Sequence, residues 1–215
     1  MTSIASPSKD SATDGSVKVD GRRLRSERTE RLIVEAYVVL VRERHKVPPA
    51  AQIAERAGYS VRSVFERFPD LNAIRVAAVD HAIAESLAQN VPIDVTADRQ
   101  SRIRLQVEVR GRGCERWLPL WRVLNTDLGE SAELEKRLRM IRELIVVRIE
   151  TIFRQELSPL ADAVERRKIV IALDALVDFE SWGRMRELYG LSFEEACSVW
   201  IHAVDRLLPP TPTAP

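Results

Sequence analysis

The sequence has few cysteines, few glycines and few aromatic residues. Two cysteines among 215 residues are too few for a disulfide framework, and eight glycines exclude collagen-like and glycine-rich chains. No apolar run approaches the roughly 18 residues that a membrane span requires. The first residues also lack the basic and apolar segments of a signal peptide. With 45% hydrophobic and 30% charged residues, the composition predicts a soluble protein with a sizeable core. The low cysteine count makes a reducing cytoplasm the expected location.

Charge and composition divide the chain into regions. Residues 1–68 contain 13 Lys and Arg against 9 Asp and Glu, whereas residues 69–215 contain 20 against 23. A basic amino-terminal third is typical of a module that binds a polyanion. Residues 1–20 are rich in Ser, Thr, Asp and Lys, which predicts a disordered tail. Residues 209–215 are expected to form a proline-rich tail after the last helix.

Between the tails, apolar residues recur with a helical period. The pattern, interrupted by proline and glycine, predicts about nine helices over 26–45, 49–57, 61–68, 71–89, 98–115, 117–128, 131–157, 160–189 and 192–208. Ser192-Phe193-Glu194-Glu195 is a capping-box pattern that begins the last of them. No convincing strand alternation is present, so the predicted fold class is all-α.

Residues 49–68 predict a helix-turn-helix. Gly58 is expected to end the first short helix, and Ser60 is a natural N-cap for the second. The helical period turns Ile53, Ala57, Val64 and Phe68 inward and Arg62, Ser63, Phe65 and Glu66 outward. An exposed second helix that carries an arginine has the shape and the donors to enter the major groove of DNA.

The same segment resembles the TetR/AcrR family of bacterial regulators. The residues that carry the resemblance are Ile53-Ala54, Ala57-Gly58, Ser60 and the run Ser63-Val64-Phe65 followed by Phe68. They are similar to the family pattern I-A-x-x-A-G-V-S-x-x-T-L-Y-x-H-F, and the clear match covers roughly residues 25–80. The resemblance implies a homodimer that binds a palindromic operator in double-stranded DNA and responds to a small-molecule effector. It divides the chain into a DNA-binding domain, 21–70, and a ligand-binding and dimerisation domain, 71–208, with 71–90 as the connecting helix.

The resemblance also implies roles for single residues. Val61, Arg62 and Ser63 fall where the family contacts base edges, Phe65 replaces a DNA-contacting Tyr, and Arg67 replaces a phosphate-binding His. The predicted DNA-binding residues are Arg22, Arg25, Gln52, Ser60, Val61, Arg62, Ser63, Phe65 and Arg67. For the arginines near the start, a minor-groove arm and ordinary solvated charges are both open, and Phe65 is either a DNA contact or a core residue.

Three positions depart from the family pattern. Pro49 replaces the usual Thr at the start of the second helix, Phe65 lacks a phenol oxygen, and Leu71 stands where a Lys often meets phosphate. Fewer phosphate contacts predict a shallower salt dependence of DNA binding. The alternative is a helical ligand-binding protein whose degenerate helix-turn-helix no longer binds DNA.

The last two long helices are apolar on more than one face. Such helices need two partners, so a second chain is expected to cover one face; a central helix within a single-chain core is the alternative. The predicted dimer interface consists of Ala172, Ala175, Val199, Trp200, Ala203, Val204 and Leu207. The family resemblance also implies a four-helix dimer interface here.

Aromatic residues of the second half are candidates for a ligand cavity. They are Trp117, Trp121, Phe153, Phe179 and Trp182, of which two or three are expected to touch the cavity while the others pack in the core. These side chains predict an apolar or amphipathic effector. Asp174 and Asp178 interrupt an apolar helix and either pair with arginines of a neighbouring helix or face the ligand.

The sequence argues against an enzyme. The histidines, His45, His81 and His202, lie on separate helices without metal-ligand spacing. No glycine-rich phosphate loop or nucleophile elbow is present, and we expect no cofactor and no metal. The function that the sequence predicts is that of a ligand-responsive transcriptional repressor.

Overall fold

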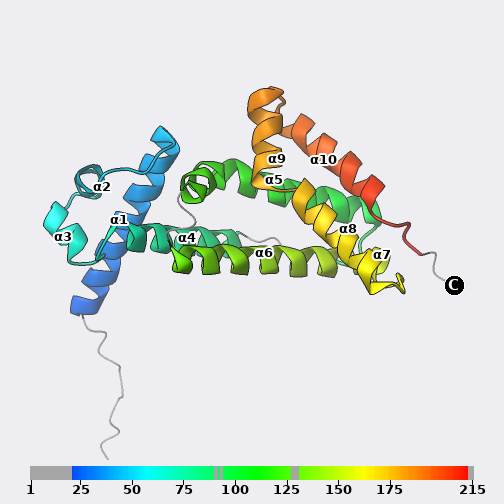
Figure 1. The fold of residues 1–215 in the computed structure, drawn as a ribbon, viewed down its shortest axis with the longest axis horizontal. Coiled ribbons are helices and arrows are strands. Elements are labelled where there is room, and N and C mark those ends of the chain that lie inside the picture. Colours follow the sequence, from blue (N-terminus) through cyan, green and yellow to red (C-terminus); the bar gives the residue numbers. More distant parts are fainter. Residues whose placement is uncertain (1–20, 90–91, 93, 127–130, 213–215) are drawn as a thin grey trace, which may run out of the picture.

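The computed structural model describes residues 21–89, 92, 94–126 and 131–212 (Figure 1). These ranges contain helices and no strand, which confirms the all-α fold class. The helices are α1 (Gly21–Arg44), α2 (Ala50–Ala57), α3 (Val61–Phe65), α4 (Leu71–Ala88), α5 (Arg99–Asn125), α6 (Ala132–Ile152), α7 (Arg154–Leu157), α8 (Ala163–Leu176), α9 (Phe179–Gly183) with a π-helical turn over Arg184–Leu188, and α10 (Phe193–Leu207). The predicted tail 1–20 lies outside the described residues. None of the described helices combines the length and apolar character that crossing a membrane requires.

A first hydrophobic core joins the amino-terminal helices to the middle of the chain. Ile33 and Tyr37 of α1, Ile53 of α2, Val64 of α3 and Ile74 of α4 are all fully buried in it. The end of α5 and the start of α6 complete this core with Trp117, Leu120, Val123, Leu124 and Leu134. Figure 1 shows α1, α2 and α3 gathered at one end of the molecule, with α4 running away from them beside α6. The short helices of the amino-terminal end are therefore packed directly onto the second half of the chain.

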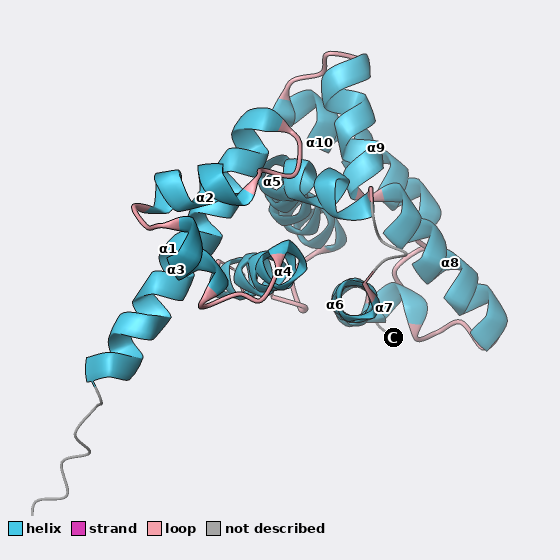
Figure 2. Ribbon diagram, turned by 60° about the vertical axis from the view of Figure 1, so that its left-hand side comes forward, coloured by secondary structure: helices cyan, strands magenta, loops and turns pink. Residues whose placement is uncertain are grey.

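A second core fills the other end of the molecule. It is formed by side chains from the first half of α5, the end of α6, and α7 to α10. Figure 2 shows these helices from another side. Trp182 and Trp200 are its largest buried side chains, and their rings lie 4.9 Å apart. Cys114 and Cys197 are also buried in it, and burial raises the pKa of each thiol to about 11. Because Phe179 packs against both cores, it joins the two ends of the molecule.

Helix α5 is continuous where the sequence predicts two helices. The expected break between 98–115 and 117–128 is wrong, because α5 runs from Arg99 to Asn125 through Gly111, Gly113 and Pro119. A Cβ on Gly111 would lie 2.8 Å from the ring of Trp182. The glycine therefore allows close packing against an aromatic ring that is distant in the sequence, and it does not end the helix.

Two other predicted helices are each divided in the structure. Residues 160–189 form α8 and α9, because the Asp178 carboxylate accepts a hydrogen bond from Ser181 N at 2.7 Å and so caps a new helix. Residues 131–157 form α6 and α7, which separate at Phe153. The capping box at Ser192 and Glu195 is present as predicted.

A buried ion pair joins the second core to the end of the chain. Arg102 of α5 donates from Nη2 to Oε1 of Glu156 at 2.5 Å and from Nη1 to Oε2 at 2.8 Å, and both side chains are fully buried. Thr211 also donates to Glu156 at 2.6 Å, and Arg99 donates to the carbonyl of Pro209 at 2.6 Å. The part of the predicted proline-rich tail that the structure describes is therefore bound to α5 and α7.

Candidate functional site

The turn between α2 and α3 has the local chemistry that the sequence predicts. Gly58 adopts the left-handed conformation, with φ of 76°, and its N–H bonds back to α2. Ser60 Oγ accepts a hydrogen bond from Ser63 N at 3.1 Å and caps α3. Val64 and Phe68 face the first core, as expected. These contacts fix the direction of α3 relative to α2.

The outer face of α3 is open to solvent. The side chain of Arg62 is 89% exposed, and Val61 and Phe65 are 40% and 43% exposed. The exposure of Phe65 excludes the alternative in which it is a core residue. Helix α3 ends at Phe65 and not at Phe68, which leaves Arg67 exposed beyond its last turn. A short helix thus presents a cation and two apolar side chains to any partner of this face.

A salt bridge on α3 was not expected from the sequence. Arg62 Nε donates to Glu66 Oε1 at 3.0 Å, four residues further along the chain. The spacing of Arg62 and Glu66 could have indicated this salt bridge, since residues i and i+4 are neighbours on a helix. Glu66 aligns the guanidinium of Arg62 and adds a negative charge to this exposed face.

The other predicted DNA-binding residues lie around this helix. Arg25 is exposed on α1, the backbone of Arg22 lies in the first turn of α1, and its side chain lies outside the described residues. Gln52 accepts a hydrogen bond from Arg44 Nη1 at 2.8 Å, which ties α2 to the end of α1. The hydroxyl of Thr29, which no sequence pattern marked, donates to Tyr59 Oη at 3.3 Å and ties α1 to the turn.

Two of the departures from the family pattern have a structural role of their own. Pro49 occupies the N-cap position of α2 without a side-chain hydrogen bond. Leu71 is half-buried and packs against the first core. Neither side chain can donate a hydrogen bond to a phosphate.

Most of the predicted ligand-pocket aromatics have other partners. The guanidinium groups of Arg42 and Arg116 lie over the ring of Trp117, 4.9 and 5.2 Å from its centroid, and the ring packs in the first core. Trp121 stacks on Phe179, with ring centroids 5.0 Å apart. Trp182 faces an outer cleft, so four of the five aromatics lie away from the inner cavity.

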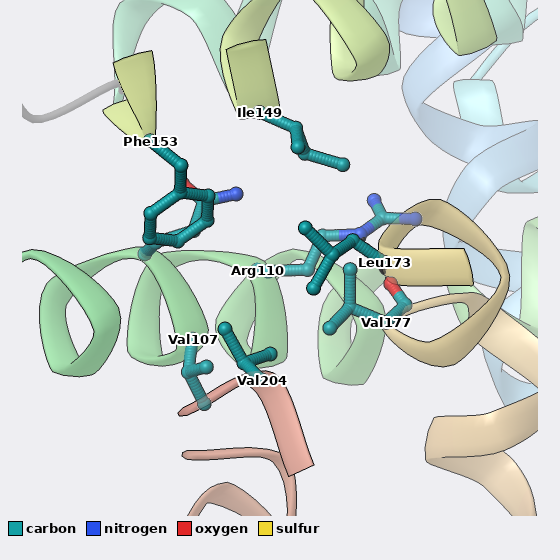
Figure 3. Close-up of a pocket in the computed structure, with 8 residues that line it drawn as sticks. Val107, Arg110, Ile149, Phe153, Leu173, Val177 and Val204 are labelled. Atoms are coloured by element: carbon teal, nitrogen blue, oxygen red, sulfur yellow. Dashed lines mark hydrogen bonds between the residues drawn. The ribbon is translucent and has the colours of Figure 1, made fainter. Parts of the chain in front are cut away.

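The inner cavity lies between α5, α6, α8 and α10. Its lining residues are Gln106, Val107, Arg110, Ile149, Phe153, Leu173, Val177 and Val204 (Figure 3). Phe153 is the member of the predicted aromatic set that lines it. The cavity volume is about 10 Å³, which is room for about one water molecule. A ligand of ordinary size therefore requires the surrounding helices to move apart.

The two interrupting aspartates have different surroundings. Burial raises the pKa of Asp174, while the charges of Arg110 on α5 and Arg142 on α6 partly oppose that shift. Asp174 thus lies near arginines of neighbouring helices, which was one of the two expectations for it. Asp178 caps α9, a role that was not among the expectations.

The predicted dimer-interface residues divide into two groups. Trp200 and Val204 are 0% and 3% exposed and belong to the second core, so placing them at a contact between chains is wrong. Trp200 lies against Trp182 and Ser181 of α9, and Val204 lines the inner cavity together with Val107 of α5 and Leu173 of α8. The remaining residues are exposed or half-buried on α8 and α10, which pack against each other: Ala172, Ala175, Val199, Ala203 and Leu207.

An outer cleft of about 510 Å³ lies between α5, the π-helical turn and the start of α10. Three carboxylates line it, those of Glu115, Glu187 and Glu195, with Arg186 as the cation. Trp182 Nε1 donates to Glu115 at 2.6 Å. Hydrogen bonds from Arg186 above all, and from Trp182, lower the pKa of Glu115, so this carboxylate is charged at neutral pH.

Comparison with known proteins gives a match at the level of the fold. No protein-family model and no curated protein matches the sequence. Among solved structures, a candidate TetR-family transcriptional regulator from Rhodococcus sp. is similar at 17% identity and a TM-score of 0.62, over 85% of this chain and 99% of that one. A transcriptional regulator from Rhodococcus sp. Rha1 is similar at 15% identity and a TM-score of 0.63, over 87% of this chain and 99% of that one. A candidate transcriptional regulator from Pseudomonas aeruginosa PAO1 is similar at 17% identity and a TM-score of 0.60, over 87% of this chain and 95% of that one. The chain has the fold of TetR-family transcriptional regulators.

Proposed function

We propose that the protein is a homodimeric transcriptional regulator that acts in the cytoplasm and binds DNA through α3. The observation that carries this proposal is the two-sided character of α3. Val64 and Phe68 anchor one side in the first core, while the Arg62 side chain is 89% exposed on the other. An arginine on an exposed, firmly anchored helix can reach O6 and N7 of a guanine in the major groove. In this proposal residues 21–70 form the DNA-binding domain.

The second part of the proposal concerns regulation. Residues 71–208 form the ligand-binding and dimerisation domain, and the protein is a repressor that an effector releases from its operator. Support comes from the inner cavity and from the exposed apolar side chains on α8 and α10, such as Ile171 and Val199. The effector acts by binding more tightly to a dimer whose α3 helices have the wrong spacing for DNA. The coupling free energy equals the effector's difference in affinity for the two states.

The test is selection of bound duplexes from a random-sequence library by the full-length protein at physiological salt. Enrichment of an inverted repeat is expected, because a two-fold symmetric dimer meets two half-sites. The enriched sequence, placed upstream of a reporter gene, should lower its expression when the protein is present. Absence of any enriched sequence would favour the alternative, a helical ligand-binding protein that does not bind DNA.

A further inference from the structure

The surface of the inner cavity is almost wholly apolar. Six aliphatic and aromatic side chains line it, and the two polar residues that also line it, Gln106 and Arg110, both come from α5. They are four residues apart and so share one face of that helix. Arg148 of α6 donates from Nε to Oε1 of Gln106 at 2.9 Å, and burial lowers the pKa of its guanidinium. Two arginines thus lie at the edge of a cavity whose own surface favours hydrocarbon.

Arg110 also holds the helix that covers the cavity. Its Nε donates to the carbonyl oxygen of Val177 at 2.8 Å, and Val177 is the residue that ends α8. Figure 3 shows the side chain of Arg110 extending along the cavity toward Leu173 and Val177. A carboxylate adds the attraction between two full charges to the hydrogen bond that it accepts from a guanidinium, and a neutral carbonyl does not. An anion in the cavity would therefore compete with Val177 for Arg110.

We propose that the inner cavity binds a carboxylic acid with an apolar body, and that its carboxylate replaces the Val177 carbonyl as the acceptor of Arg110. The exchange frees the end of α8, which lets the cavity open around the hydrocarbon part of the ligand. The ligand class rests on the cavity alone. The regulatory consequence rests on the proposed function and deepens it.

A chain of contacts leads from Arg110 toward the amino-terminal helices. The guanidinium of Arg110 lies 4.9 Å from the centroid of the Phe179 ring, which stacks on Trp121. Trp121 Nε1 is buried without a hydrogen-bond partner among the described residues, so movement of this ring breaks no such bond. One turn earlier on α5, Trp117 is held by Arg42 of α1. A shift of the Arg110 guanidinium would therefore reach the contact between α5 and α1 through Phe179 and Trp121.

The charges near the cavity favour an anion over a cation. Asp174 is half-buried close to Arg110 and Arg142, but it does not line the cavity. The three carboxylates of the outer cleft, in contrast, would attract a cationic amphiphile. The two sites thus predict opposite preferences for the charge of a headgroup.

The experiment compares decanoate, decanol and decyltrimethylammonium, which share one hydrocarbon chain, by calorimetry with the full-length protein and no DNA. We expect decanoate to bind the wild-type protein roughly tenfold or more tightly than decanol, because its carboxylate forms an ion pair with Arg110 that a hydroxyl cannot form. Arg110→Met should reduce this preference to about twofold or less. Arg104→Met, at an exposed position of the same helix, should leave it unchanged.

Equal affinity of the wild-type protein for decanoate and decanol would overturn the inference, whereas binding of the ammonium compound that Arg110→Met leaves unchanged would report the outer cleft. This comparison uses the wild-type protein, so it holds even if Arg110→Met does not fold. Decanoate should also shift the tryptophan emission, and Trp121→Phe should remove most of that shift. If decanoate binds but leaves the DNA affinity unchanged, the regulatory part is wrong. If the protein binds no DNA at all, the proposed function fails and calorimetry still decides the ligand class.

Discussion

At the scale of single residues, Arg62 and Arg67 are expected to contribute to DNA binding in different ways. Arg62 projects from the face of α3 opposite Val64, where its guanidinium can reach a base edge. Arg67 lies beyond the end of α3, and a contact with phosphate there fixes register without reading sequence. Arg62→Ala should cost about 1–3 kcal/mol on the specific site and relax the preference at one base pair of each half-site.

Arg67→Ala should instead weaken binding to all DNA sequences about equally. It should also reduce, by about one unit, the slope of the logarithm of the affinity against the logarithm of the salt concentration. Affinities measured across a library of operator variants, at several salt concentrations, separate the two effects. An Arg62→Ala variant that keeps both its affinity and its base preference would show that α3 does not read DNA through this residue.

The orientation of α3 could be predicted from the sequence because it depends on local spacing. Val64 and Phe68 are four residues apart and Arg62 lies opposite them, so the helical period alone separates the buried from the exposed side. Trp117 shows why the ligand-pocket residues could not be predicted. Its ring is occupied by Arg42 of another helix, and no pattern within α5 reveals a partner 75 positions away.

Glu156 provides a test of the second core through pH. Burial alone would raise the pKa of its carboxyl, but hydrogen bonds from Arg102 and Thr211 outweigh burial and lower the pKa below the ordinary 4.5. The charged form therefore stabilises the fold fully above about pH 4.5, and this stability is lost as the pH falls through the lowered pKa. Glu156→Gln, which leaves Arg102 buried without its anion, should reduce the free energy of unfolding at pH 7 by about 3–5 kcal/mol.

The difference between this variant and the wild-type protein should narrow below about pH 4.5, as the wild-type carboxyl becomes protonated. Urea unfolding of both proteins at neutral and acidic pH measures this difference in the free energy of unfolding. Glu150→Gln, at an exposed position of α6, is the matched control and should change stability little at either pH. A constant difference at all pH values would mean that the charge of Glu156 is not what stabilises this core.

At the scale of elements, helix starts could be predicted better than helix ends. The caps at Ser60 and Ser192 depend on side chains within a few residues, and both are present. Gly111, in contrast, lies within the continuous helix α5, where it packs against the ring of Trp182 of another helix. Local sequence marks Gly111 as a helix breaker, and tertiary packing overrides that preference.

Gly58 and Gly113 should respond to the same substitution in opposite directions. Gly58 has φ of 76°, which costs an L-residue about 1–2 kcal/mol, and a Cβ there would meet nothing within 4 Å. Gly58→Ala should therefore lower the free energy of unfolding by that amount, and Gly58→Asn by less. Gly113 lies within α5 with open space around it, so Gly113→Ala should raise stability by about 0.5–1 kcal/mol. Chemical denaturation checks both, and a loss at Gly113 equal to that at Gly58 would contradict the conformational explanation.

At the scale of the whole molecule, the sequence indicates that α8 and α10 are apolar on more than one face, but not which face the chain itself covers. Trp200 turns inward, where its Nε1 donates to Ser181 Oγ at 3.2 Å. Val164, Ile171 and Ala175 form an exposed stripe along α8, since they are spaced by seven and four residues. The surface available to a second chain is therefore this stripe together with the exposed residues of α10.

This surface predicts which substitutions should prevent the formation of a dimer. A stable dimer buries more than roughly 1,000 Å² in total, so a charge at its centre should separate the chains. Ile171→Glu, at a position 54% exposed, should give a folded monomer in light scattering at micromolar concentration. Val147→Glu introduces the same charge at a position 58% exposed on α6, and this variant should remain a dimer.

Trp200→Glu should unfold the protein instead, because it places a carboxylate in the second core. A wild-type protein that is monomeric at micromolar concentration would contradict the dimer, and with it the expectation of a two-fold symmetric operator.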